Sequence, residues 1–139
     1  TAATFVEFDG VRWAIPGDRA VIEDDGTITV LGRGSQCINT GGEKVFPEEV
    51  EAVLKSHPDV LDVLVVGVPD DRWGATVTAV VQTRSGQALS LEALREHGRA
   101  DLAGYKLPRL AVPVEAIVRG PNGKPDYRWA ERLAMEGIT

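Results

Sequence analysis

The run DVLDVLVVGV at residues 59–68 restricts most strongly what this chain can fold into. It is apolar nearly throughout, which is typical of a strand whose two faces are both covered by other elements. A second β-rich run, VTAVVQTR, follows at residues 77–84. We therefore expect a small sheet with helices packed against it.

Helix-forming segments with apolar faces accompany these strands. Pro47 suits the first turn of a helix, and Val50, Val53 and Leu54 share one face at helical spacing. Ser90 is a candidate N-cap for a further helix, whose buried side is expected to include leucines. The expected order after residue 45 is helix, strand, strand, helix, strand and helix, within residues 47–57, 59–68, 77–84, 90–103, 105–118 and 128–137. This order predicts an α+β fold.

The first third of the chain has a different sequence pattern. Short β-rich runs alternate with turn sequences at Asp9-Gly10, Pro16-Gly17-Asp18 and Asp25-Gly26, which predicts two hairpins between residues 3 and 32. Two hairpins of this size bury little by themselves. We expect them to belong to a sheet or barrel that continues outside this sequence, and the absence of an initiator Met favours a piece of a longer protein.

Composition excludes some classes of function. The net charge of −6, from 21 acidic and 15 basic residues, argues against nucleic acid as the main partner. The single cysteine, Cys37, cannot form an internal disulfide, which favours a reducing compartment and predicts a cytoplasmic protein. No apolar run approaches the roughly 20 residues that span a bilayer, and the N-terminus does not resemble a signal peptide.

Taken one at a time, the candidate sites are ambiguous. Lys124 lies in the turn-rich segment PNGKPDY, where a long-reach cation suits a phosphate or carboxylate oxygen, but a lone lysine on a turn is usually solvated surface. The same ambiguity holds for Asp18, Arg33 and the glycine pair Gly41-Gly42. His57, His97 and Cys37 lack the neighbours of a metal site or nucleophile, and Trp13, Trp73 and Trp129 are expected to pack.

Taken together and in order, five segments resemble the adenylate-forming superfamily, which contains acyl-CoA synthetases, adenylation domains of peptide synthetases and luciferases. The segments are PGDRAVIEDDGTITVLGR, INTGGEKVFPEEVE, DDRWGATVTAVV, LAGYKLPR and PNGKPDYRWA. The amino-acid sequences of the second and last segments are similar to those of actinobacterial acyl-CoA synthetases that act on fatty acids or sterol side chains. Each segment alone is weak, but five in the correct order cover almost the whole chain.

The resemblance implies roles for matching positions. Asp18 matches the carboxylate that holds the ribose of ATP, Arg33 a nucleotide-contacting arginine, and Lys124 the lysine that reaches the substrate carboxylate and α-phosphate during adenylation. The C-terminal domain of this superfamily then rotates on a hinge. Ser35 occupies the hinge position, where Asp or Lys is common. After the rotation, the glycine hairpin lines the tunnel for the pantetheine arm of CoA, which corresponds to residues Gly41, Gly42, Glu43 and Lys44.

The resemblance also implies a domain organisation and an activity. Residues 1–33 would end an N-terminal domain, and residues 34–139 would form the mobile C-terminal domain. The whole enzyme would activate a carboxylic acid with ATP and Mg²⁺ and transfer it to CoA. The Mg²⁺ and main ATP sites and the acyl pocket would lie in the partner N-terminal domain, so this part would be inactive alone. The alternatives are an adenylation domain that loads a carrier protein, and a non-catalytic α+β interaction module.

Overall fold

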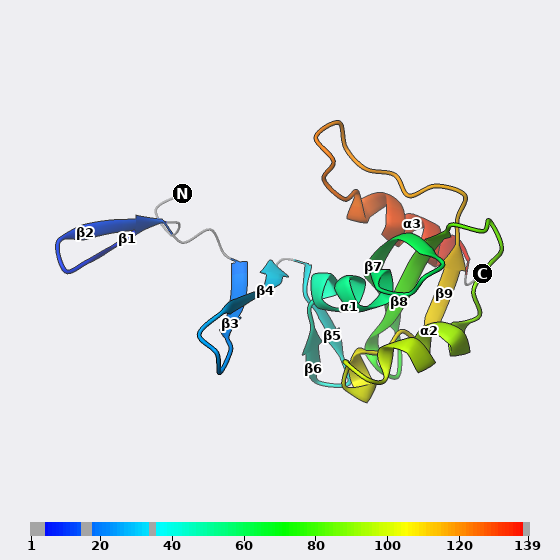
Figure 1. Cartoon of the computed structure of the whole chain (residues 1–139), viewed down its shortest axis with the longest axis horizontal. Coiled ribbons are helices and arrows are strands. Elements are labelled where there is room, and N and C mark those ends of the chain that lie inside the picture. Colours follow the sequence, from blue (N-terminus) through cyan, green and yellow to red (C-terminus); the bar gives the residue numbers. More distant parts are fainter. Residues whose placement is uncertain (1–4, 15–17, 34–35, 138–139) are drawn as a thin grey trace.

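A three-stranded sheet forms the centre of the molecule. The computed structural model describes residues 5–14, 18–33 and 36–137 of the chain. Strands β7 (Val60–Asp70) and β8 (Gly74–Thr83) pair antiparallel, and β9 (Leu110–Pro113) joins β8 in parallel, which gives the order β7-β8-β9 (Figure 1). The predicted α+β fold is confirmed. Strands β7 and β8 extend beyond the predicted runs because their pairing continues to the turn, where Asp70 lies opposite Gly74.

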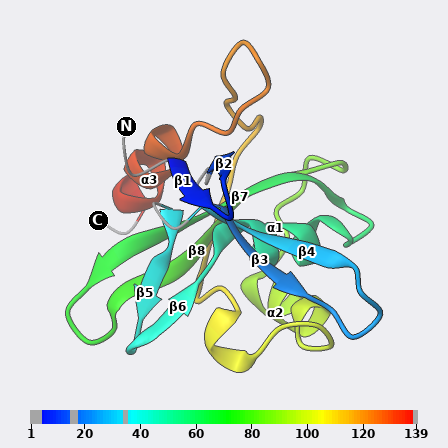
Figure 2. The ribbon, with the colours of Figure 1, turned by 90° about the vertical axis from the view of Figure 1, so that its left-hand side faces the viewer.

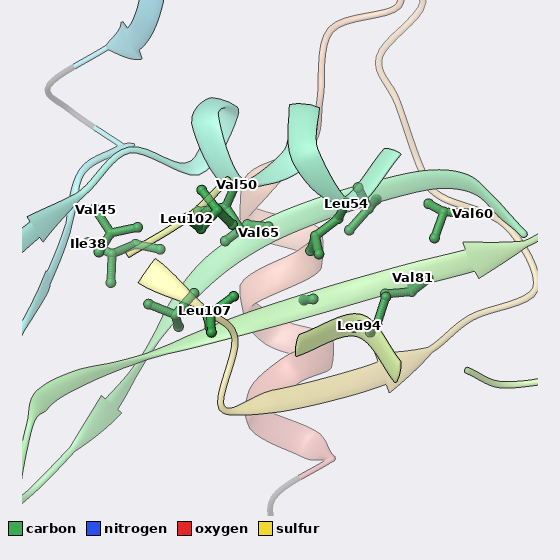
Figure 3. Packing of buried hydrophobic residues seen from close by; sticks show 13 residues of the cluster. Ile38, Val45, Val50, Leu54, Val60, Val65, Val81, Leu94, Leu102 and Leu107 are labelled. Atoms are coloured by element: carbon green, nitrogen blue, oxygen red, sulfur yellow. The ribbon is translucent and has the colours of Figure 1, made fainter. Parts of the chain in front are cut away.

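The sheet is buried on both faces, as the apolar run predicts. Side chains alternate along β7, so that Val63 and Val65 enter one core cluster while Leu64 and Val66 enter a second cluster on the other face. The first cluster packs against helices α1 (Pro47–Lys55) and α2 (Leu91–Gly98) (Figure 3). The second packs against α3 (Tyr127–Glu136). Neither face of the sheet is left to water.

Helix α1 begins at Pro47 and α2 follows its Ser90 N-cap, as predicted. Helix α3 begins at Tyr127, one residue before the predicted start, and its Asp126 cap was not predicted. Pro47 is the first residue of α1, the Ser90 hydroxyl accepts a hydrogen bond from the Ala93 amide at 3.1 Å, and the Asp126 carboxylate accepts one from the Trp129 amide at 3.0 Å. Each cap satisfies an amide that has no partner within its helix.

The predicted extension of the second helix to residue 103 is wrong. Helix α2 ends at Gly98, and a short 3₁₀ helix, η3 (Gly104–Lys106), follows the turn. A side chain at Gly98 would lie 2.8 Å from the Leu107 Cδ2 atom, so the chain approaches itself closely here. Leu102 still reaches the first core cluster, from the turn rather than from the helix.

Both predicted N-terminal hairpins are present, to one side of the central sheet (Figure 1). The first pairs β1 (Phe5–Phe8) with β2 (Val11–Ala14), around Asp9 and Gly10 in left-handed conformations. The second pairs β3 (Asp18–Ile22) with β4 (Ile28–Arg33). Asp18 therefore belongs to a strand rather than to the predicted turn, whose other residues, Pro16 and Gly17, lie outside the described part. Several apolar side chains of the hairpins are exposed, with Phe8 at 73% and Ile22 at 76%.

A third hairpin lies on the turn end of the central sheet. Strands β5 (Ile38–Thr40) and β6 (Glu43–Val45) pair antiparallel, and their short ribbon packs against β7 and β8 (Figure 2). The fit is close at Gly67, where an added Cβ would lie 3.0 Å from the Ile38 side chain. The sequence GRGSQCINTGGEKVF, predicted as a turn, a connection and a short ribbon, thus contains a ribbon fixed to the sheet.

Leu54 on α1 tests whether the first core cluster holds the sheet and helices together. The side chain is fully buried, so Leu54→Ala should lower the free energy of unfolding of this chain by about 2–5 kcal/mol. Chemical denaturation with a linear fit measures the change. Leu61→Ala is the matched control on β7, because Leu61 is 44% exposed, and it should cost less than about 1 kcal/mol. Equal losses in both variants would contradict this description of the core.

Candidate functional site

Lys124 lies at the exposed end of the loop between β9 and α3, which projects from the body (Figure 1). The loop folds back on itself: the Gly120 amide donates to the Lys124 carbonyl at 2.8 Å, and the Gly123 amide donates to the Gly120 carbonyl at 2.9 Å. The Asn122 side chain accepts from the Lys124 amide at 3.3 Å. Asn122 therefore closes the turn that presents the lysine.

Two polar contacts hold the part of this loop that carries Lys124, residues 119–127, to the body, and these residues are called the lysine loop. At the first end, the Arg119 guanidinium forms a two-point ion pair with the Asp62 carboxylate of β7, with N–O distances of 2.7 and 2.8 Å. At the second end, the Tyr127 hydroxyl donates to the Glu51 carboxylate of α1 at 3.0 Å. The lysine is therefore carried by a loop that is fixed at both ends.

Glu51 is an unusual carboxylate because it lies inside the protein, on the sheet-facing side of α1. It also accepts a hydrogen bond from the Val65 amide of β7 at 2.9 Å. Burial raises the pKa of Glu51 to about 7, even though the hydrogen bonds from Val65 and Tyr127 act in the opposite direction. Burial, followed by the charge of Glu51, raises the pKa of Tyr127, so its hydroxyl stays protonated and remains a donor.

The pKa of Asp62 is shifted in the opposite direction from that of Glu51. Burial acts to raise its pKa, but hydrogen bonds from Arg119 and Lys55 outweigh this effect and hold the pKa of Asp62 below its ordinary value. The Lys55 ammonium lies 3.2 Å from the carboxylate. Asp62 therefore stays ionised at neutral pH and keeps its ion pair with Arg119.

The glycine pair forms the tip of the β5–β6 hairpin. Both residues adopt left-handed conformations, with φ of 58° at Gly41 and 84° at Gly42. The Gly41 amide donates to the Trp73 carbonyl at 2.8 Å, and an added Cβ at Gly41 would lie 3.2 Å from the Trp73 ring. A Cβ at Gly42 would meet nothing within 4 Å. Gly42, together with the exposed residues Glu43 and Lys44 on β6, therefore faces open space.

Trp73 supports the hairpin from the turn between β7 and β8. The Asp70 carboxylate shapes this turn by accepting hydrogen bonds from the Trp73 and Arg72 amides at 2.9 and 2.8 Å. The Arg109 guanidinium lies over the indole ring at 4.1 Å from its centre. The sequence DDRWG, which begins the third segment that resembles the superfamily, thus supplies Trp73 as the aromatic side chain that packs against the glycine pair. Trp129 packs in the second core cluster as predicted, and the side chain of Trp13 is outside the described part.

Asp18 and Arg33, the predicted nucleotide-contacting residues, are paired across the β3–β4 hairpin as Cα partners. The structure describes only the backbone of these two residues. Ser35, the predicted hinge residue, lies outside the described residues. The structure therefore brings Asp18 and Arg33 onto neighbouring strands.

The Lys124 loop and the glycine hairpin lie at opposite ends of the body. In both views, the loop between β9 and α3 rises at the top while the β5–β6 hairpin lies at the bottom (Figures 1 and 2). The two candidate elements therefore do not form one site within this chain.

Sequence reasoning missed Glu51 and Asp62, although each leaves a signal. Glu51 falls on the apolar face of its helix, with Pro47, Val50 and Leu54. Asp62 interrupts an otherwise apolar strand. A charge at a position where the pattern demands an apolar residue indicates a buried partner, but the pattern does not say where the partner lies.

The two histidines, which were considered from the sequence as possible metal ligands, contact other parts of the fold. His97 Nε2 lies 2.7 Å from the Ser56 hydroxyl and 3.2 Å from the Val53 carbonyl, and its ring meets that of His57 edge to face. Among residues 5–14, 18–33 and 36–137, no group of three or more His, Cys, Asp or Glu residues is placed to hold a metal ion. No helix in the same ranges has the length and apolar character needed to cross a membrane.

A family model for the AMP-binding enzyme C-terminal domain matches residues 49–124, more than half of the chain. The chain belongs to this family. The match begins on α1, next to Glu51, and ends at Lys124. Both anchors of the lysine loop on the body, Glu51 and Asp62, are therefore part of the AMP-binding enzyme C-terminal domain.

Individual relatives agree with this assignment. A medium/long-chain-fatty-acid–CoA/3-oxocholest-4-en-26-oate–CoA ligase of Mycobacterium tuberculosis is 61% identical over 94% of this chain and 24% of its own length. A 3-oxocholest-4-en-26-oate–CoA ligase of Rhodococcus rhodochrous is 58% identical, with the same coverage. The chain thus spans about a quarter of these curated relatives.

Solved structures share the fold. The structure of apo MatB from Rhodopseudomonas palustris matches all of this chain and 27% of its own, with a TM-score of 0.83 and 28% identity. A Mycobacterium tuberculosis fatty acyl CoA synthetase matches 90% of this chain and 24% of its own, with a TM-score of 0.72 and 34% identity. The match to MatB includes the N-terminal hairpins as well as the central sheet.

Glu51 makes the stability of this AMP-binding enzyme C-terminal domain depend on pH. Its pKa is about 7 in the folded chain and near the ordinary value of 4.5 when unfolded, so the folded state binds the proton more tightly. The Glu51 contribution to stability should therefore be largest below pH 4.5 and should be lost as pH rises to 7, by as much as about 3 kcal/mol.

Glu51→Gln should remove this dependence, because an amide does not titrate. The measurement is the difference between wild-type and variant unfolding free energies from pH 5 to pH 8, so that contributions from other groups cancel. The variant should gain stability relative to the wild type as pH rises. A difference that stays constant over this range would show that Glu51 does not titrate there.

Proposed function

We propose that this chain is the C-terminal part of an ATP-dependent acyl-CoA synthetase, and that Lys124 acts in its adenylation step. The observation that carries the proposal is an exposed lysine on a loop anchored at both ends, within a domain of the AMP-binding enzyme family. The names of the relatives, which are CoA ligases for fatty acids and a sterol-derived acid, support the reaction class.

Lys124 has the chemistry that adenylation requires. When a carboxylate attacks the α-phosphorus of ATP and pyrophosphate leaves as the bond to its bridging oxygen breaks, negative charge accumulates on oxygens around the reacting centre. An ammonium group at the end of a long side chain neutralises this charge without taking part in bond formation. The turn closed by Asn122 and Gly123 leaves the lysine exposed, so that a second domain could bring the nucleotide to it.

The glycine hairpin suits a second, separate step. Gly42 leaves open space beside its backbone, so an extended thiol arm such as the pantetheine of CoA could pass close to the hairpin. Gly41, Glu43 and Lys44 complete the proposed tunnel wall. Because the hairpin and the lysine loop lie at opposite ends of the body, each would face the active site in a different orientation of the domain (Figures 1 and 2). Ser35 is the proposed hinge.

The remaining functions belong to a partner N-terminal domain. We assign residues 1–33 to the end of that domain and residues 34–139 to the mobile one. Asp18 would hold the ribose of ATP and Arg33 would contact the nucleotide, while Mg²⁺ would bind with the phosphates outside this chain. The exposed apolar side chains of the first two hairpins are consistent with a covering domain.

The names of the relatives support the proposed substrates. We propose a fatty acid or a sterol side chain as the carboxylic acid, free CoA as the acceptor, and the cytoplasm as the location. A structural neighbour named amide bond synthetase McbA, with 33% identity and a TM-score of 0.80, has a name that indicates a different product. Thioester formation with free CoA, measured directly, therefore distinguishes this proposal from transfer to a carrier protein or an amine.

Lys124→Ala should separate the two half-reactions in the enzyme that contains this chain. Loss of the ammonium group should slow acyl-adenylate formation by about 10²–10³-fold, while attack of CoA on preformed acyl-adenylate should be largely unchanged. Rapid-quench assays of each half-reaction measure the two rates. Arg132→Ala, which removes an exposed cation on α3, is the control and should affect neither rate. Equal slowing of both half-reactions by Lys124→Ala would contradict the proposed role.

Gly42→Asn should have the reverse effect. Asparagine tolerates the left-handed conformation better than most residues, so the variant adds a side chain in open space with little backbone strain. The rate of CoA attack should fall while adenylate formation and the thermal unfolding temperature stay close to wild type. Unchanged thioester formation would exclude the region beside Gly42 as the path of the thiol arm.

A further inference from the structure

We propose that Asp62 and Glu51 are positioning residues for Lys124, because they hold the two ends of the loop that carries it. This inference deepens the proposed function and rests on it. The tip of the loop, residues 120–124, consists of Gly, Pro, Asn, Gly and Lys, and Asn122, Gly123 and Lys124 are all exposed. Apolar packing holds the first part of the loop through Val114 and Ile117, so the position of the tip depends on the polar contacts that fix it.

The first anchor sets the start of the loop. The Arg119 guanidinium binds both oxygens of Asp62, and the same side chain donates to the Gly123 carbonyl at 3.2 Å. One guanidinium thus connects strand β7 to the residue directly before Lys124. The Asp62 carboxylate is held in turn by Lys55 and by the Val63 amide at 2.9 Å, so it provides a fixed point.

The second anchor sets the end of the loop. Tyr127 is the first residue of α3, three positions after Lys124, and its hydroxyl contacts both oxygens of Glu51 at 3.1 and 3.0 Å. Glu51 is itself fixed to β7 through the Val65 amide. Because Asp126 also caps α3, the chain leaves the loop in a defined direction.

These anchors differ from ordinary stabilising contacts. The Asp62–Arg119 ion pair is partly buried, with side chains 16% and 30% exposed, so the loss of hydration offsets part of the attraction between its charges. Its advantage is geometric, since a two-point pair between a guanidinium and a carboxylate fixes distance and angle together. Displacement of a catalytic group by about 1 Å can slow a reaction by roughly 10²-fold, so the anchors should matter more for the rate than for folding.

The test uses Asp62→Asn and Tyr127→Phe in the enzyme that contains this chain, each alone and combined with Lys124→Ala. Each anchor variant should slow acyl-adenylate formation by about 10- to 100-fold and leave CoA attack on preformed acyl-adenylate unchanged. In the Lys124→Ala background the same substitutions should have no further effect, because there is no lysine left to position. Asp59→Asn is the matched control, since Asp59 binds Ser85 rather than the lysine loop, and it should change neither rate.

Two results would overturn the inference: equal slowing of both half-reactions, or an unchanged effect of the anchor variants when Lys124 is absent. Either would show that Asp62 and Glu51 act only on the fold. A separate measurement distinguishes this failure from failure of the proposed function.

Amide hydrogen exchange of Gly120 and Gly123 in the 139-residue chain reports loop order without any reaction. Exchange should accelerate several-fold in both anchor variants and not in Asp59→Asn. If exchange accelerates but Lys124→Ala has no effect on adenylation, Asp62 and Glu51 do fix the loop, and the proposed role of Lys124 is wrong. If exchange is unchanged, the anchors themselves are refuted.

Discussion

Burial of the β7–β8 hairpin on both faces is the constraint on which the rest of the structure depends. Because neither face tolerates water, the chain must supply α1 and α2 to one face and α3 to the other. The parallel strand β9 requires a crossover, which α2 and η3 provide on the first face. The chain must then pass the edge of the sheet to reach the second face. The segment that makes this passage is the loop with Lys124.

Two carboxylates, the buried Glu51 and the partly buried Asp62, belong to these layers, and their partners explain why. Glu51 replaces an apolar side chain on the sheet-facing side of α1, and Asp62 replaces one at the start of β7. Each charge is costly to bury without partners. Each is satisfied by backbone amides of β7 and by a group at one end of the lysine loop. Carboxylates therefore replace apolar side chains at two positions, one on α1 and one on β7, and these carboxylates fix an exposed loop to the body.

The sequence predicted the elements better than the contacts between them. Apolar periodicity, Pro47 and Ser90 are local signals, so the strands, helices and caps could be expected within a few residues. The end of α2 was missed because Leu102 continues the apolar pattern, whereas the close approach of Gly98 to Leu107 depends on the tertiary fold. Arg119 and Asp62 are 57 positions apart, and Tyr127 and Glu51 are 76 apart. No local pattern links charges at such separations.

The same strand that anchors the lysine loop also supports the glycine hairpin, and this has a mechanical consequence. Asp62 lies near one end of β7, while Asp70 at the other end shapes the turn that brings Trp73 against Gly41. Between these residues the strand extends roughly 27 Å at the usual rise per residue. It is paired along its length and packed on both faces, so it acts as a rigid spacer. The two elements therefore cannot approach each other by local rearrangement. Any reaction that uses both in turn must move the whole domain.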